Sequence, residues 1–277
     1  MDIPEKICDA HLHFGAPEPL KAIADNSPLK ERFPCYRTVE FDRMDDYQAR
    51  FDEHHVWKTV LIPFVFRELD KDAESLFVIS QAQKDPEHFY PYALLNEASP
   101  DFAENHYQEI VGLKEHIVMH QTVLTDTRKI IFEMLQAHGL TLLIHTYAEP
   151  RIQYVTDIVK NFPRLKIQIA HMGRAKPGVI PFMLNIIDAV RSFENVTFDT
   201  STVRESIIVT EAVKRIGAER ILYGSDFPFF MDETGTEDIM EKQILHVLGA
   251  EITNAQKEQI FFKNFDHWIT YGRQIAD

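Results

Sequence analysis

The sequence predicts an α/β protein, a (β/α)8 or TIM barrel that forms a single domain over residues 1–277. Short β-rich segments alternate with amphipathic helical segments along the chain, which is typical of a parallel sheet. There are eight such units, and 277 residues is close to the length of about 250 that is typical of this barrel. An open, doubly wound sheet is the alternative, but the glycine-rich phosphate turn that it needs after its first strand is absent.

Each expected strand is a short apolar run that ends near polar residues. In chain order, the eight segments are KICDAHLHF (6–14), WKTVLIPFV (57–65), FYPYALLN (89–96), EIVGLKEHI (109–117), LTLLIHTY (140–147), LKIQIAHMG (165–173), NVTFDTST (195–202) and RILYGSDFP (220–228).

The helical segments between them carry apolar residues at three- and four-residue spacing. Several end with expected stop signals, namely Gly139 and Gly217 after the last turn and Pro163 just beyond another. The clearest of them are residues 126–139, 151–163, 182–194 and 204–217.

One connection is much longer than the others. Residues 15–40 contain several prolines and precede the first regular helix, which we expect to begin near Asp42. Connections longer than about 12–15 residues are often lids or binding loops. Because this loop leaves the first strand, we favour a lid over a plain covering loop.

Composition excludes some classes of partner. The net charge is −14, so the chain should repel nucleic acids and anionic membranes, and no apolar run is long enough to span a bilayer. The N-terminus has no secretory signal, and Cys8 and Cys35 form no CxxC pair. These features predict a reduced, cytoplasmic environment.

Ionisable residues gather at the ends of five expected strands, where barrels of this kind carry their chemistry. They are His11 and His13 on the first strand, Lys114 and His116 on the fourth, His145 on the fifth, His171 on the sixth and Asp226 on the eighth. Each alone could be an ordinary hydrogen-bonded residue. Together they need partners if buried, and imidazoles plus a carboxylate suit zinc, iron or manganese.

These motifs give the chain a specific resemblance to a known family. DAHLHFG, GLKEH, LLIHT, IAHMGR and LYGSDFP occur in the order and spacing of the amidohydrolase superfamily. The branch that the chain resembles, amidohydrolase family two, includes aminocarboxymuconate-semialdehyde decarboxylase, resorcylate decarboxylase and pyrone-dicarboxylate lactonase. The resemblance implies a metal-dependent enzyme and, by analogy, a homodimer.

Carried over to this chain, the resemblance implies that His11, His13, His145 and Asp226 bind one divalent metal ion, which we expect to be zinc. His171 would then be an acid or base beside the ion. Lys114 stands where some members carry a carboxylated lysine that bridges two ions, in which case His171 would bind the second. His116 could touch the substrate or be structural.

Two reactions fit this set of residues. In the leading hypothesis the enzyme hydrolyses a lactone or amide with a metal-activated water, Asp226 takes the proton and His171 assists the oxyanion. The alternative is non-oxidative decarboxylation of a small aromatic or unsaturated acid. Resorcylate-type decarboxylases often carry an acidic residue in place of the first histidine. This chain keeps His11 at that position, which leaves both reactions open.

Three arginines follow expected strands and could anchor a substrate carboxylate, namely Arg67, Arg174 and Arg204. Asp9 could support His11, but we expect it at the barrel floor.

Overall fold

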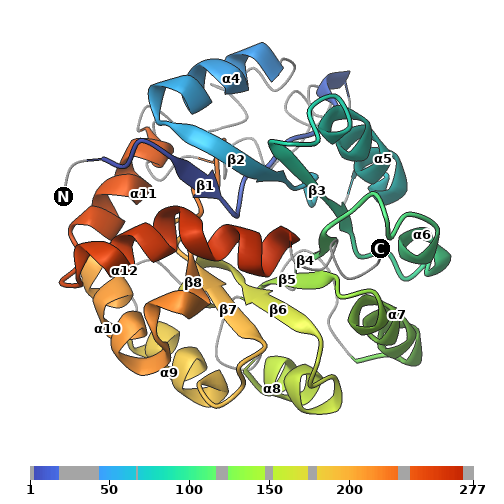
Figure 1. The fold of residues 1–277 in the computed structure, drawn as a ribbon. Helices are drawn as coiled ribbons and strands as arrows, with labels where there is room; N and C mark the ends of the chain where they lie inside the picture. The colour runs from blue at the N-terminus through green and yellow to red at the C-terminus, as the bar shows by residue number, and fades with distance from the viewer. Residues whose placement is uncertain are drawn as a thin grey trace.

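A computed structural model describes residues 3–18, 44–66, 68–116, 124–146, 152–173, 180–229 and 238–270. Eight parallel strands form one sheet in the order β1 to β8, surrounded by helices (Figure 1). The strands are β1 (Ile7–Asp9), β2 (Val56–Leu61), β3 (Phe89–Leu94), β4 (Gly112–His116), β5 (Thr141–His145), β6 (Lys166–Ile169), β7 (Val196–Asp199) and β8 (Ile221–Leu222).

The first and last strands meet, which closes the barrel. The backbone N–H of Ala10 donates to the carbonyl of Tyr223 at 2.8 Å, and Leu12 forms a parallel bridge with Phe227. The prediction of a (β/α)8 barrel is therefore confirmed. The first strand is shorter than expected, because regular pairing ends at Asp9 and is followed by two isolated bridges, that of Leu12 and that of His13 with Ile62.

The helices alternate with the strands as predicted. They are α4 (Met44–Glu53), α5 (Lys71–Ala82), α6 (Asp101–Asn105), α7 (Asp126–Ala137), α8 (Ile152–Asn161), α9 (Ile180–Val190), α10 (Ser206–Ile216), α11 (Ile239–Leu248) and α12 (Asn254–Glu258). Side chains cap several of these helices. Thr125, for example, accepts a hydrogen bond from the backbone N–H of Arg128 at the start of α7. No described helix is long and apolar enough to cross a bilayer.

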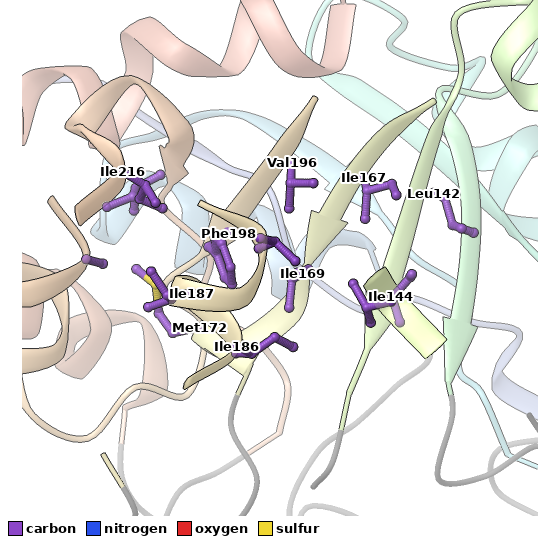
Figure 2. Packing of buried hydrophobic residues seen from close by; sticks show 14 of the residues in the cluster. Leu142, Ile144, Ile167, Ile169, Met172, Ile186, Ile187, Val196, Phe198 and Ile216 are labelled. Atoms are coloured by element: carbon purple, nitrogen blue, oxygen red, sulfur yellow. The ribbon is translucent and has the colours of Figure 1, made fainter. Parts of the chain in front are cut away.

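Side chains alternate between the two faces of each strand. The apolar ones pack against the helices, and the polar ones face the interior of the barrel. Ile144 of β5, Ile169 of β6 and Phe198 of β7 belong to the apolar cluster that also holds Ile186 and Ile187 of α9 (Figure 2). The neighbouring positions, among them His145, Gln168 and Asp199, point to the other face and into the barrel. The outward apolar side chains thus fix which polar side chains face inward.

The C-terminal segment, residues 254–270, covers one end of the barrel. It is drawn in red in Figure 1, where it crosses the strands. Phe265 and Trp268 pack with Cys8 of β1 and Tyr90 of β3, near the points where these strands begin. Lys58, close to the start of β2, pairs with Asp266 at 2.6 Å. This end is therefore the closed floor, and the carboxyl ends of the strands lie at the opposite end.

Only the first part of the expected lid is described. Residues 15–18 follow the first strand, and residues 19–43 lie outside the described part of the chain, so the lid stays a prediction.

Candidate active site

The structure brings most of the predicted polar residues to one end of the barrel. His116 and His145 are paired in register at the ends of β4 and β5. His171 lies in the turn Ala170–Gly173 directly after β6, and Asp226 lies four residues after β8. His11, His13 and Lys114 are buried beside them, with at most 3% of their surface exposed.

Two of these residues sit on backbone turned into the left-handed region. φ is 58° at His171 and 64° at Asp226, conformations that non-glycine residues adopt rarely and that concentrate at functional sites. Gly224 allows the last strand to approach the first closely. A β-carbon at position 224 would lie 2.8 Å from the β-carbon of His11, so any other residue would displace that histidine.

His11 and His13 both direct a ring nitrogen at Asp226. Nε2 of His11 lies 3.3 Å and Nε2 of His13 lies 3.5 Å from the same carboxylate oxygen. Nδ1 of His13 is 3.2 Å from the carbonyl of Pro63, which can only accept, so Nδ1 carries the proton and Nε2 carries a lone pair. A lone pair that faces a carboxylate oxygen favours a cation between them, so these residues fit a metal ion.

His145 and His171 form a second pair. Nε2 of His171 and Nδ1 of His145 are 2.8 Å apart, and the ring of His145 stacks on His116 with centroids 4.0 Å apart. His11, His171 and Asp226 offer ligand atoms that all lie within 4.8 Å of one another. His171 thus lies close enough to bind an ion with His11 and Asp226, or to act on a substrate beside it.

Burial controls the charge of these side chains. It lowers the pKa of His171 to about 3 and that of His13 to about 4, so both rings are neutral at pH 7. Burial alone would raise the pKa of Asp226, but the neighbouring His171, His13 and His11 outweigh it and hold that pKa below its usual value. Neutral imidazoles and an ionised carboxylate are the forms that bind metal ions.

Lys114 is fully buried among these groups. Its Nζ lies 3.3 Å from Nε2 of His11. Burial lowers its pKa to about 8, although Asp199 and Asp226 act in the opposite direction. The amine is therefore partly neutral near physiological pH, which carboxylation by carbon dioxide requires.

The structure describes one of the three arginines that were predicted as carboxylate anchors. Arg204 is exposed, two residues before α10. Arg67 and Arg174 lie outside the described residues, so their role remains a prediction.

Asp199, which was not predicted from the sequence, lies at the end of β7 with 0% of its surface exposed. It contacts Nδ1 of His11 at 2.9 Å, and it also binds Gln168 and Ser201. The signal was present, because Asp199 ends an expected strand just as His145 does. Asp9, which we expected at the floor, accepts hydrogen bonds from the backbone N–H groups of His11 and Ser225, each at 3.0 Å.

Comparisons with known proteins agree with this architecture. The model of the family described as amidohydrolase matches residues 8–264. The comparison with curated proteins found no match.

Solved structures with this fold include decarboxylases and a hydrolase. The 5-carboxyvanillate decarboxylase of Sphingomonas paucimobilis is 15% identical, with a TM-score of 0.73 and coverage of 96% of this chain and 99% of that one. A dihydroxybenzoic acid decarboxylase from Polaromonas sp. JS666, with bound manganese and 2-nitroresorcinol, is 19% identical, with a TM-score of 0.70 and coverage of 97% and 98%. The probable 2-pyrone-4,6-dicarboxylic acid hydrolase of Acinetobacter baumannii, with citric acid bound, is 15% identical, with a TM-score of 0.73 and coverage of 96% and 99%. At these identities the likeness establishes the fold.

Proposed function

The chain belongs to the amidohydrolase family and is an enzyme, and we propose that it removes carbon dioxide from a small aromatic or unsaturated carboxylic acid without an oxidant. The sequence alone favours hydrolysis, with decarboxylation as the alternative. The structural comparisons favour decarboxylation, because most of the compared structures are decarboxylases of aromatic acids and one is a hydrolase.

The observation that carries this proposal is a group of aromatic rings beside the candidate metal ligands. Phe64 and Phe66 follow β2 and stack with centroids 5.6 Å apart. Phe229, after β8, lies 5.6 Å from Phe64 and meets the ring of His13 edge-on at 5.2 Å. Phe64 and Phe66 are buried, and Phe229 is partly exposed. A planar ring could pack against the Phe229 side of this group while its carboxylate reaches the polar residues.

The metal centre is part of the same proposal. His11, His13, His145 and Asp226 would hold one divalent ion, with zinc or manganese as the candidates. When bound, the ion supplies positive charge that orients an anionic substrate and stabilises charge that develops on it.

The protein's own residues would then transfer one proton to the substrate carbon. Decarboxylation breaks the bond between the ring carbon and the carboxylate, releases carbon dioxide and leaves an electron pair on that carbon. A proton must replace the lost group. Nε2 of His171 or the carboxylate of Asp226 would first take up a proton from solvent and then deliver it to that carbon. The phenylalanine rings keep water away from the carbon, so the proton comes from the positioned group.

Hydrolysis of a lactone or amide is the second candidate, which the shared fold of the pyrone-dicarboxylic acid hydrolase supports. In that reaction Asp226 would take the proton of the attacking water, and His171 would stabilise the oxyanion. Lys114 and His116 would contact the substrate in either case. Arg67, Arg174 and Arg204 would bind a second carboxylate if the substrate is a di-acid.

A cytoplasmic location and a homodimer belong to this proposal as well. Cys8 is buried as a free thiol, and burial raises its pKa to about 12, which fits a reduced, unreactive cysteine.

The experiment is a substrate panel of aromatic acids, enoic acids, lactones and amides, run in D2O and separately in H2(18)O. Decarboxylation is expected to release carbon dioxide and to place one deuterium on the product carbon. Hydrolysis would instead place one 18O in the product and release no carbon dioxide, and that result would overturn the proposal.

Variants identify the residues. His171→Asn and Asp226→Asn should each lose activity by about 100-fold or more, since general acid or base catalysis contributes about that much. His55→Asn is the control, because His55 is exposed and has a φ of 58°, which asparagine tolerates.

A further inference from the structure

Asp199 lies between the candidate ligand His11 and the candidate acid or base His171. One carboxylate oxygen, Oδ2, is 2.9 Å from Nδ1 of His11 and 2.7 Å from Nε2 of Gln168. The other, Oδ1, accepts the backbone N–H groups of His171 at 2.9 Å and Ser201 at 3.2 Å. It also accepts the hydroxyl of Ser201.

A carboxylate can only accept hydrogen bonds, so all of its partners must donate. Nδ1 of His11 therefore carries the proton, which leaves the lone pair of Nε2 facing Asp226. Lys114, a donor 3.3 Å from that Nε2, fits the same arrangement.

Through Ser201, Asp199 also determines which ring nitrogen carries the proton in His171 and His145. Because the Ser201 hydroxyl donates to Asp199, its oxygen is free to accept from Nδ1 of His171, 2.7 Å away. The carbonyl of Ser201, 3.2 Å from that Nδ1, also requires a donor there. Nε2 of His171 must then accept from Nδ1 of His145, so Nδ1 of His145 carries the proton and its Nε2 carries a lone pair.

We propose that Asp199 is a positioning residue that sets the tautomers of His11, His171 and His145. It directs Nε2 of His11 toward Asp226 and the metal ion, leaves Nε2 of His145 unprotonated, and holds the backbone of His171 in its left-handed turn. The inference rests on the metal centre of the proposed function and is independent of the reaction that the centre catalyses. General experience with metal-bound histidines supports such a role, since outer carboxylates fix both tautomer and orientation.

Asp199→Asn is the informative change because it keeps the shape and adds one donor. The backbone N–H groups beside Oδ1 cannot be reversed, so the asparagine oxygen must stay on that side. The new NH2 group then faces His11, which must accept through Nδ1 and carry its proton on Nε2. That nitrogen can no longer bind a metal ion.

The first test is 15N NMR of histidine rings in the metal-free, full-length protein, with His11 assigned by the loss of its signals in His11→Gln. We expect the Nδ1–H form of His11 in the wild type and the Nε2–H form in Asp199→Asn. An Nε2–H form in the wild type, or the same tautomer in both proteins, would overturn the inference. The wild-type spectrum decides the matter even if the variant does not fold.

The second test is binding of Mn2+, followed by the EPR signal of the free ion. Asp199→Asn should bind Mn2+ at least about tenfold more weakly than the wild type. Asp85→Asn is the matched control, because Asp85 lies 2.8 Å from Nδ1 of His88 in a surface histidine–aspartate pair between α5 and β3, at the opposite end of the barrel.

The outcomes separate this inference from the proposed function. If the wild type and the control bind Mn2+ while Asp199→Asn binds it equally well, the positioning role is wrong. If the wild type binds neither Mn2+ nor Zn2+, the metal centre itself is wrong, and the NMR result still decides which tautomer Asp199 imposes.

Discussion

Single buried residues in this protein carry pKa values far from those in water. The clearest case outside the candidate site is Glu74, on α5, which is 2% exposed and accepts a hydrogen bond from the backbone N–H of Ala16 at 3.2 Å. Burial raises the pKa of its carboxyl from 4.5 to about 7. The folded protein therefore holds this proton at pH values where the unfolded chain releases it.

Glu74 should make the protein less stable as the pH rises. Below pH 4.5 the Glu74 carboxyl is protonated in both the folded and the unfolded protein, so its titration does not change the free energy of unfolding. Between pH 4.5 and about 7 the unfolded chain ionises first, so the free energy of unfolding falls by an amount on the order of 1–3 kcal/mol. Glu74→Gln should remove this part of the pH dependence and should be more stable than the wild type at pH 8.

Urea denaturation at pH 5 and pH 8 measures this effect. Glu133→Gln, on the exposed side of α7, is the control and should keep the wild-type pH dependence. An equal loss of stability from pH 5 to pH 8 in the wild type and in Glu74→Gln would show that the carboxyl does not titrate in this range.

Among the elements, β4 is anchored from outside the barrel. Its inward residues Lys114 and His116 flank Glu115, which points away from the barrel and is 1% exposed. Glu115 pairs with Arg128 of α7 and accepts the hydroxyl of Tyr154, on α8, at 3.0 Å. This buried cluster ties two helices to the strand that carries candidate site residues.

Arg128→Met should destabilise the protein by about 3–5 kcal/mol, because it leaves the buried Glu115 without its charged partner. The double variant Arg128→Met with Glu115→Leu should recover much of this loss, since no unpaired charge remains. Urea denaturation of both single variants and the double variant measures the coupling. Losses that simply add would show that the two side chains contribute independently.

In the whole molecule, the apolar residues that close the barrel and the residues of the candidate site lie at opposite ends of the barrel. Phe265 and Trp268 close the floor, while His11, His171 and Asp226 lie beyond the carboxyl ends of the strands. Changes at the site should therefore alter function without unfolding the protein, as in other barrels of this kind.

Protein purified without chelators should contain about one equivalent of a divalent metal ion. A chelator should abolish activity, leave the far-UV circular dichroism unchanged and lower the thermal midpoint, because an ion that binds only the folded state stabilises it. Asp226→Asn should show no shift of the midpoint when metal is added. Elemental analysis and thermal denaturation measure these quantities.

Two equivalents of metal would indicate instead that Lys114 is carboxylated and bridges the ions. Lys114→Arg would then reduce the metal content to one or none. A complete absence of metal after reconstitution with Zn2+ and Mn2+ would contradict the proposed mechanism while leaving the fold unchanged.

Local sequence patterns were sufficient for the fold and for most of the candidate site. Alternating segments such as LKIQIAHMG fixed both the strand and the face that carries its apolar residues. Because every strand of a barrel presents its end to the same side, His145, His171 and Asp226 could be placed together without a structure.

Other features depended on contacts between residues far apart in the chain. The role of Asp199 follows from distances to His11, 188 positions away, and to residues of β6, and no local pattern encodes such a distance. The left-handed turns at His171 and Asp226 likewise depend on how neighbouring strands pack. Periodicity records only which face of an element is apolar. Proton positions and ligand geometry are decided by the atoms that tertiary packing brings within hydrogen-bonding distance.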